Sequence, residues 1–516
     1  MPPSPPRVAN RGLLTASSMI AVLMQVLDST IANVALPYMQ GSLNATLDQI
    51  SWVLTSYVIA SAIMTAPVGW LAQRFGRKNL FLICLVGFTG TSMLCGAAQS
   101  LDQIVIFRIL QGACGGALVP LSQATMLDTY TLEERAQAMA IFGIGVMVGP
   151  ILGPTIGGWL TENYNWRWVF YVNLPFGLLS VTGIALFMPA APVNKDLKFD
   201  WTGFAALAIG IGALQLMLDR GESQDWFTSG EVIIEAVAAG LGLYLFGVHM
   251  LTAPKPFIPP ALFKDTNFSS GMSMMFATGV IMMASSALLA PYLQNLAGYP
   301  VQETGLLLAP RGFGTMAAML ISARMGAWLD PRKVIAFGMI LLGYTLRDMA
   351  SWTPDISVSA MVTAMLLQGF AMGCVWNPTT VLSFVTLPAQ FRGDATALQG
   401  LVRNVGAAAG ISIVTFALTT NIQVSHSEMA AGINLFNRNL QGGGAVSRML
   451  DPSNERGALR LNAMINREAA VIAYSNDFLM MSYIVYPPLL LLPFMRRPRP
   501  ILRETGVPAH AEVVVD

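Results

Sequence analysis

Apolar segments of about twenty residues recur along the whole chain, separated by polar connections. A helix of that length spans the roughly 30 Å hydrocarbon core of a bilayer, because each helical residue adds about 1.5 Å. The pattern predicts fourteen membrane-spanning helices, at residues 14–37, 51–72, 79–98, 103–127, 138–160, 168–188, 200–219, 230–251, 268–292, 304–326, 334–351, 357–382, 395–418 and 473–494. We therefore expect an all-α polytopic membrane protein.

Basic residues gather on alternate connections between these segments. Arg74, Arg77 and Lys78 follow the second segment, and Arg332 and Lys333 follow the tenth, whereas the intervening short connections carry few basic residues. Basic loops stay in the cytoplasm, so the pattern predicts two cytoplasmic termini and an even number of spans. The first apolar segment is too long for the core of a cleaved signal peptide, and its loss would break this parity.

One connection is much longer than the others. Residues 419–472 lie between the last two predicted spans and contain Gly442, Gly443 and Gly444, followed by a helical pattern up to Glu468. We expect this segment to be a partly ordered hairpin on the outer side, where long loops do not follow the charge rule.

The chain repeats itself at a constant offset of 257 residues. The run 69–71 is echoed after residue 326, the run 110–112 at 367–369, and Gly149 and Gly153 at Gly406 and Gly410. A constant offset across several spans indicates two homologous halves of six spans in parallel orientation. The predicted organisation is a cytoplasmic N-terminus 1–13, a six-helix bundle 14–188, two inserted spans within 200–251, a second bundle 268–494 and a cytoplasmic tail 495–516.

Composition narrows the class of protein. Hydrophobic residues make up 54% of the chain, charged residues only 11%, and the net charge of +1 gives no bias toward nucleic acid. The four Cys residues are scattered in apolar segments, which indicates neither a disulfide framework nor a metal site. The three His residues are equally scattered, so no catalytic constellation can be assembled and we do not expect an enzyme.

Asp28 is a carboxylate in the middle of the first apolar segment. An acid at that depth costs roughly 3 kcal/mol on insertion scales, so it is a functional candidate by default. Arg108 lies in the fourth segment at a depth that differs by only about 6 Å, which an Arg side chain could bridge. A change in their separation between two conformations would change the proton affinity of the carboxylate, which is a means of proton coupling.

Simpler interpretations of this pair remain open. Asp28 could be a polar packing residue that does not titrate, and Arg108 could extend toward the outer membrane surface. The positions 257 residues further on are Ser285 and Met365, which cannot titrate. Any proton handling is therefore expected in the first half.

Further ionisable residues lie within or beside apolar segments of the second half. Arg311 and Arg403 could line a cavity and form a second ionisable site, or Arg311 could pair with Glu303 two turns earlier.

Four motifs occur in order along the chain. The run 27–37 carries Asp28, Asn33 and Pro37; the loop 69–78 carries Gly69, Arg74, Gly76, Arg77 and Lys78; the run 108–112 is followed by Pro120; and the run 149–160 carries Gly149, Gly153, Pro154, Gly157 and Gly158. Together they resemble the fourteen-span drug:proton antiporters, the EmrB/QacA group of the major facilitator superfamily, and its EmrB-like branch in particular.

The resemblance implies the major facilitator fold, with two six-helix bundles and two extra spans between them. It also implies a substrate cavity between the halves, for which polar residues within spans are candidates: Asn33, Tyr57, Gln111, Gln123 and Gln368. The 31 Met residues would suit a deformable drug cavity, although such residues more often pack helices or face lipid.

The loop 69–78 departs from the family pattern, because Gln73 stands where an acid is common. The family's charge relay from that acid therefore cannot be carried over. Arg74, Arg77 and Lys78 could gate the cytoplasmic side or simply fix topology. The Gly and Pro residues of 149–160 have a physical reason of their own, because Gly permits close helix contact and Pro lets a helix bend.

The resemblance implies a proton-driven exporter of hydrophobic or amphipathic compounds in the inner membrane of a Gram-negative bacterium. It needs no cofactor besides the proton gradient, and its implied partners are a periplasmic adaptor and an outer-membrane channel. Alternatives are an exporter of one metabolite or siderophore, a proton symporter, a membrane-embedded enzyme and a non-transporting receptor.

Overall fold

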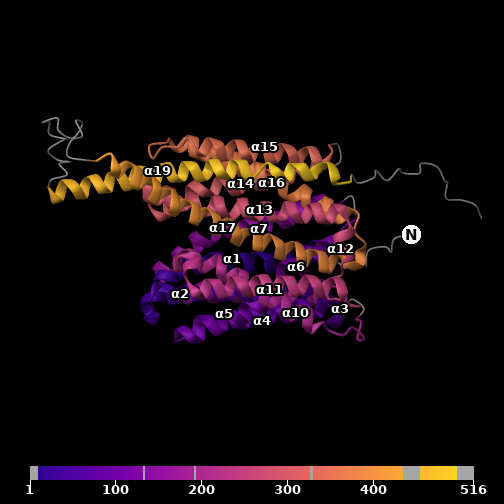
Figure 1. Ribbon diagram of the computed structural model, residues 1–516. Coiled ribbons are helices and arrows are strands. Elements are labelled where there is room, and N and C mark those ends of the chain that lie inside the picture. Colours follow the sequence, from indigo (N-terminus) through magenta and orange to yellow (C-terminus); the bar gives the residue numbers. More distant parts are fainter. Residues whose placement is uncertain (1–9, 132–133, 191–192, 326–328, 434–453, 497–516) are drawn as a thin grey trace, which may run out of the picture.

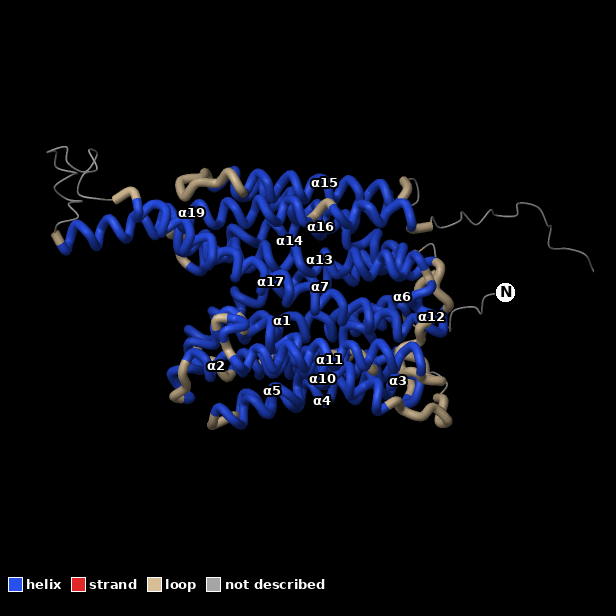
Figure 2. The backbone as a smooth tube through the Cα atoms, viewed as in Figure 1, coloured by secondary structure: helices blue, strands red, loops and turns tan. Residues whose placement is uncertain are grey.

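The computed structural model describes residues 10–131, 134–190, 193–325, 329–433 and 454–496. Within these ranges the chain forms helices joined by loops, and no strand (Figure 2). The described part therefore matches the all-α class that the apolar pattern predicts.

The first half contains short helices as well as long ones. Its elements are α1 (Arg11–Leu43), α2 (Leu47–Thr65), α3 (Val68–Phe75), α4 (Arg77–Ala97), α5 (Leu101–Gly115), α6 (Leu118–Thr129), α7 (Arg135–Asn163), α8 (Trp168–Tyr171) and α9 (Asn173–Phe187).

Two inserted helices and a short one come next, followed by the second half. These elements are α10 (Trp201–Arg220), α11 (Gly230–Thr252), α12 (Ala261–Lys264), α13 (Thr266–Pro291), the π-helical turn η3 (Tyr292–Leu296), α14 (Val301–Met325), α15 (Pro331–Met349), α16 (Val358–Val385), α17 (Arg392–Ala431), α19 (Glu455–Ile484) and the 3₁₀ segment η5 (Pro487–Phe494).

Each of the fourteen predicted spans falls on one of these helices or on a consecutive pair. By length and composition, 11 described helices could cross a membrane, or 12 if α2 and α3 count as one span. Helix α7 is not among them and counts only as a shorter apolar helix, over Arg135–Gly149. Helix α15 carries two charged residues near each end, which lowers its apolar character. The count of fourteen spans stays a prediction.

The second predicted span is not one straight helix. The segments Gln49–Thr65 and Val68–Phe75 are bent by 59°. The break falls at Pro67, which has no backbone N–H to continue the helix. The expected single span 51–72 is therefore a bent pair, and α3 carries residues 69–75 of the loop motif while Arg77 and Lys78 begin α4.

The long outer connection is more helical than the sequence indicates. Helix α17 continues to Ala431, and α19 begins at Glu455, well before the predicted span at 473. His426 of α17 and Asn462 of α19 share a hydrogen bond of 2.9 Å, so the two helices pair beyond the bundle (Figure 1). The glycine run 442–444 lies outside the described residues.

The two halves of the chain lie on opposite sides of the molecule (Figure 1). Helices α13 to α19 form one side, while α1 to α6 form the other together with the inserted α10 and α11. Helix α7 packs on both α1 and α14, and α17 packs on α13, α3 and α6. The start of α1 and the end of η5 lie at the same end of the bundle, as an even number of crossings requires.

The 257-residue repeat is visible in helix packing. A Cβ on Gly112 of α5 would overlap the Tyr57 carbonyl of α2, and a Cβ on Gly369 of α16 would overlap the Arg311 carbonyl of α14. The same glycine therefore brings the corresponding helix pair together in each half. The matching position Gly326 lies outside the described residues.

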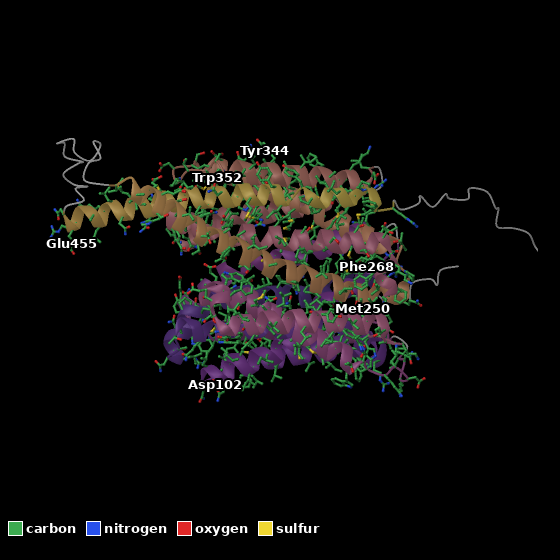
Figure 3. The ribbon with its side chains drawn as sticks, in the orientation of Figure 1. Asp102, Met250, Phe268, Tyr344, Trp352 and Glu455 are labelled. Atoms are coloured by element: carbon green, nitrogen blue, oxygen red, sulfur yellow. The ribbon has the colours of Figure 1, made fainter. Side chains whose placement is uncertain are left out.

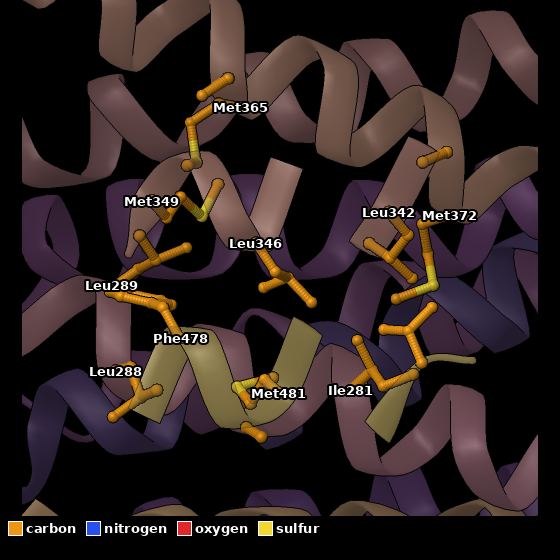
Figure 4. Close-up of a cluster of buried hydrophobic side chains, with 14 of the residues drawn as sticks. Ile281, Leu288, Leu289, Leu342, Leu346, Met349, Met365, Met372, Phe478 and Met481 are labelled. Atoms are coloured by element: carbon orange, nitrogen blue, oxygen red, sulfur yellow. The ribbon is translucent and has the colours of Figure 1, made fainter. Parts of the chain in front are cut away.

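Methionines fill much of the core of the second half. Met349, Met365, Met372 and Met481 lie in one buried cluster with Phe478 (Figure 4). These residues pack helices against one another, which is the more ordinary of the two roles that the sequence allows.

Candidate functional site

Asp28 and Arg108 form a fully buried ion pair. The Nη1 atom of Arg108 on α5 lies 2.7 Å from Oδ2 of Asp28 on α1, and both side chains are 0% exposed. The depth match inferred from the sequence is therefore a direct contact. A charge pair held out of water needs further hydrogen bonds to be tolerated.

Two amides supply those hydrogen bonds to the carboxylate. Gln111 Nε2 donates to Oδ1 of Asp28 at 2.9 Å, and Asn173 Nδ2 donates to the same oxygen at 2.7 Å. Asn173 begins α9 and also donates to Ser92 Oγ at 2.9 Å. Helices α1, α4, α5 and α9 thus meet at one polar cluster, which we call the Asp28 network.

Arg108 is fixed on the other side by the backbone and an aromatic ring. Its Nε donates to the Val53 carbonyl at 2.9 Å, and Nη1 also donates to Gln111 Oε1 at 2.8 Å. Its guanidinium carbon lies 4.1 Å from the centre of the Tyr57 ring, a cation–π contact. These contacts hold the side chain inside the bundle, so the alternative of an arginine that reaches for the membrane surface is wrong.

Asn173 and Ser92 are members of this network that the sequence reasoning missed. Asn173 is a polar residue at the start of an apolar helix, the same signal that singled out Asn33. Asn33 itself is exposed and donates only to the Ser29 carbonyl, at 3.4 Å. Polarity within a span therefore found the right kind of residue without showing which helix faces would meet.

Three donors from two other helices point at the Asp28 carboxylate in this conformation. A movement of α1 away from α5 or α9 would remove some of these donors. The surroundings of the carboxylate therefore depend on how these helices are placed relative to one another.

The second half has no carboxylate at the matching position. Ser285 stands 257 residues after Asp28, and Arg311 of α14 donates to its hydroxyl at 3.0 Å. Arg311 also donates to Ser286 at 2.8 Å and to the Met282 carbonyl at 3.2 Å. Glu303 is exposed and makes none of these contacts, so of the two alternatives for Arg311 the pairing with Glu303 is wrong.

The other residues predicted to line a substrate cavity lie in different parts of the structure. Tyr57 and Gln111 belong to the Asp28 network, and Gln368 is buried with Nε2 3.9 Å from the Met349 sulfur. Gln123 alone among the five lines a cavity between the two halves, where its Nε2 donates to Gln399 Oε1 at 3.2 Å. Arg403 lines the same cavity.

The motif at 69–78 lies where the two halves touch. Arg77 and Arg392 both pair with Asp128, so that one carboxylate of the first half binds a cation from each half. Gln73 Nε2 donates to Asp394 Oδ2 of α17 at 3.4 Å, and a Cβ on Gly69 would overlap that carboxylate. The acid that the motif lacks is thus provided by the opposite helix. We call these contacts the cytoplasmic clasp, using the orientation that the loop charges predict.

Other residues of this motif have local roles. Lys78 donates to the Ala185 carbonyl of α9 at 2.7 Å, and Gly76 has a φ of 85° that favours glycine. Arg74 is half-buried in α3.

The glycine series on α7 faces α1. A Cβ on Gly149, Gly153 or Gly157 would crowd Val26, Thr30 or Ile31 respectively, whereas Gly158 has open space beside it. The first three are spaced by four residues and form one row, so they set the distance between the two helices. Gly158 is not part of this row. Pro154 lies in the same helix, and its side chain is outside the described part of the structure.

Within the described residues, no group of three or more His, Cys, Asp or Glu side chains is placed to hold a metal ion.

Comparison with known proteins places these features in a family. The sequence model of the Major Facilitator Superfamily matches residues 18–411. The chain is 33% identical to the multidrug export protein EmrB of Escherichia coli K12 over 488 residues, which covers 94% of this chain and 95% of that protein. It is 36% identical to EmrB of Haemophilus influenzae, covering 82% of this chain and 84% of that one. Among solved structures, the human organic anion transporter MFSD10 shares the fold alone, with a TM-score of 0.58 and 14% identity over 93% of this chain and 99% of that one.

Proposed function

Because the chain belongs to the major facilitator superfamily and to its EmrB-like group, we propose that it is a proton-coupled multidrug efflux transporter for hydrophobic or amphipathic compounds. Relatives named for multidrug export match over most of their length, which supports this substrate range.

One observation carries the proton coupling. Asp28 is 0% exposed and its carboxylate accepts from Arg108, Gln111 and Asn173, which come from two other helices. An intramembrane acid held by donors on separate helices responds to any relative movement of those helices.

The transport cycle follows from this arrangement. In the present conformation the cytoplasmic clasp joins the halves at one end, through Asp128 with Arg392 and Gln73 with Asp394. Protonation of Asp28 from the outside would weaken its bond to Arg108 and release α1. The halves would then rock open toward the cytoplasm, where proton loss accompanies substrate capture. Each proton that enters across 100 mV supplies about 2.3 kcal/mol.

The location and partners complete the proposal. Likeness to the EmrB proteins of two bacteria supports an inner-membrane location, and the loop charges favour two cytoplasmic termini. The paired ends of α17 and α19 project beyond the bundle on the opposite side, toward the periplasm in that orientation (Figure 1). A periplasmic adaptor and an outer-membrane channel are the partners we propose there.

Transport in proteoliposomes tests this function. The protein is reconstituted with an imposed pH gradient, and a panel of lipophilic cations, uncouplers and antibiotics is offered to wild type, Asp28→Asn and Asp102→Asn. Asp102 is an exposed acid at the far end of α5 and serves as the matched control (Figure 3). We expect gradient-driven flux in wild type and Asp102→Asn, and its loss in Asp28→Asn.

Other outcomes of the same assay separate the alternatives. Flux of one compound only would favour a dedicated exporter of a metabolite or siderophore. Absence of flux for every compound, with binding retained, would favour a non-transporting receptor.

A further inference from the structure

A groove lies between the end of α14 and the start of α15, and we call it the α14–α15 groove. Both helices pack on α16 but only loosely on each other, so a gap is left between them. Phe370 and Cys374 of α16 form the floor of this gap, and its volume is about 130 Å³. A Cβ on Gly338 of α15 would lie 2.8 Å from the Cys374 Cβ, so α15 and α16 touch beside the groove.

The walls of the groove are apolar. They come from Ile321 of α14, Leu329, and Val334 and Phe337 of α15. Ser322 adds a hydroxyl, but it donates to the Met319 carbonyl at 3.1 Å and accepts from the Asn377 amide at 3.3 Å. No wall residue therefore calls for a polar ligand. A dry cavity of about 150 Å³ holds a benzene ring, so this groove has room for about five carbon atoms of a hydrocarbon chain.

The groove opens toward the lipid. Ile321 and Phe337 are both exposed at its rim. Phe337 is followed along α15 by Ile340 and Tyr344, which are also exposed and lie on the same face of the helix. Tyr344 lies at the outer edge of the molecule (Figure 3). In a membrane this face of α15 borders acyl chains, and a chain lying along it leads into the groove.

A lysine stands at the mouth of the groove. Lys333 is exposed, belongs to the lining and lies in the first turn of α15, four residues before Phe337 and so on the same face. Among the described residues it forms no ion pair. The nearby acid Asp330 pairs with Arg332 instead. The loop charges place this end of α15 at the cytoplasmic surface, where lipid phosphates lie.

We propose that the α14–α15 groove binds an anionic phospholipid of the cytoplasmic leaflet, with its phosphate on Lys333 and the first carbons of one acyl chain between the helices. Charge complementarity argues for an anionic headgroup. Arg324, Arg332 and Lys333 stand against Asp330 alone in this stretch, so the local charge is positive and an extra ammonium group is disfavoured.

The lysine decides which lipid is held. The walls are as apolar as the bilayer, so an acyl chain gains little when it leaves the bulk lipid for the groove. The groove fixes where the chain lies, and the phosphate contact supplies the preference. This site is separate from the Asp28 network, and its occupancy does not depend on transport.

Lipid binding by matched phospholipids tests the site. Full-length protein in detergent is titrated with dioleoyl phosphatidylglycerol or dioleoyl phosphatidylcholine, which share their chains, and native mass spectrometry counts the lipids bound. Wild type should bind the first phosphatidylglycerol about fivefold more tightly, as one lysine beside an anionic lipid provides. Lys333→Ala should abolish this preference, and Lys333→Arg should keep it because the charge remains. Lys264→Ala, an exposed lysine at the end of α12, is the control and should keep it too.

Two further arms test the acyl chain. Ile321→Trp places bulk at the rim of the groove and should weaken the first binding of both lipids. Inorganic phosphate in large excess should not displace phosphatidylglycerol from wild type, since phosphate has no chain to place in the groove.

Several results would overturn the lipid site. Equal affinity of wild type for the two lipids would remove the headgroup preference, and an equal loss in Lys333→Ala and Lys264→Ala would reduce Lys333 to an ordinary surface charge. Displacement by inorganic phosphate would indicate a site for soluble anions. Displacement by a substrate of the transport assay would assign the groove to substrate entry.

Discussion

At the scale of single residues, the ion pair whose two side chains are both fully buried lies in the first half. Asp28 and Arg108 are both sealed from solvent, and their matching positions in the second half are Ser285 and Met365. The repeat thus preserves helix packing while losing the ionisable pair. Each interaction in the Asp28 network can be removed separately, which makes its role testable.

Arg108→Ala would leave the carboxylate with two amides and no cation. We expect a loss of about 3–5 kcal/mol in folding stability, because one partner of a buried pair remains uncompensated. The thermal unfolding midpoint of purified protein measures this loss. The double variant Asp28→Asn with Arg108→Gln should recover most of the stability, since neither charge remains, but should not recover coupled transport. A single variant as stable as wild type would contradict the buried pair.

Asn173→Ala would remove one of three donors to the Asp28 carboxylate. The carboxylate then loses a hydrogen bond that joins α1 to α9, so gradient-driven transport should fall several-fold. Initial rates of transport in proteoliposomes measure the loss. Asn33→Ala is the control, because Asn33 bonds only its own helix, and an equal loss in that variant would argue against the network.

At the scale of elements, the sequence determines where helices form more reliably than how they face one another. The length of the apolar segments correctly placed all the predicted spans on helices, because the thickness of the bilayer sets how many residues a spanning helix needs. The bend at Pro67 and the helical extensions of α17 and α19 went unpredicted, since a span template assumes one straight helix that ends at the membrane. The depths of Asp28 and Arg108 in the membrane could be estimated from the ends of their predicted spans. The contact between Asn173 and Asp28 could not, because it depends on how α9 is rotated about its axis.

The glycine row of α7 offers a test at this scale. Gly153→Val would push β-branched bulk into Thr30 of α1 and should cost about 1–3 kcal/mol, as overpacking does. Transport should fall with it, because α1 carries Asp28. Gly158→Ala, which meets open space, should leave unfolding midpoint and transport near wild type. An equal loss of stability and transport in both variants would show that helix propensity sets the effect and that the close packing of the glycine row on α1 does not.

At the scale of the whole molecule, the halves are joined at the cytoplasmic end by contacts that differ from the family pattern. Asp394 on α17 takes the place of an acid in the loop motif, facing Gln73. That replacement was invisible in the sequence, because it depends on which helix of the other half lies against α3. A clasp of partly exposed ion pairs is weak enough to open during a transport cycle.

Arg392→Ala would remove one inter-half ion pair from Asp128. A partly exposed pair contributes up to about 1 kcal/mol, so the population open at this end should rise by up to about fivefold. Spin labels at the exposed positions Asn79 and Gln390, read by double electron–electron resonance, would show a larger long-distance fraction. Arg11→Ala removes a pair with Glu134 inside the first half and should leave the distribution unchanged.

The central claim is that Asp28 carries the transported proton, and counting protons tests it most directly. Weakly buffered, detergent-purified protein is mixed with a saturating substrate from the transport assay, and released protons are followed with a pH indicator dye. The account predicts release in proportion to bound substrate by wild type and by Asp102→Asn, with none from Asp28→Asn. Release from Asp28→Asn equal to that of wild type, with substrate still bound, would contradict the account.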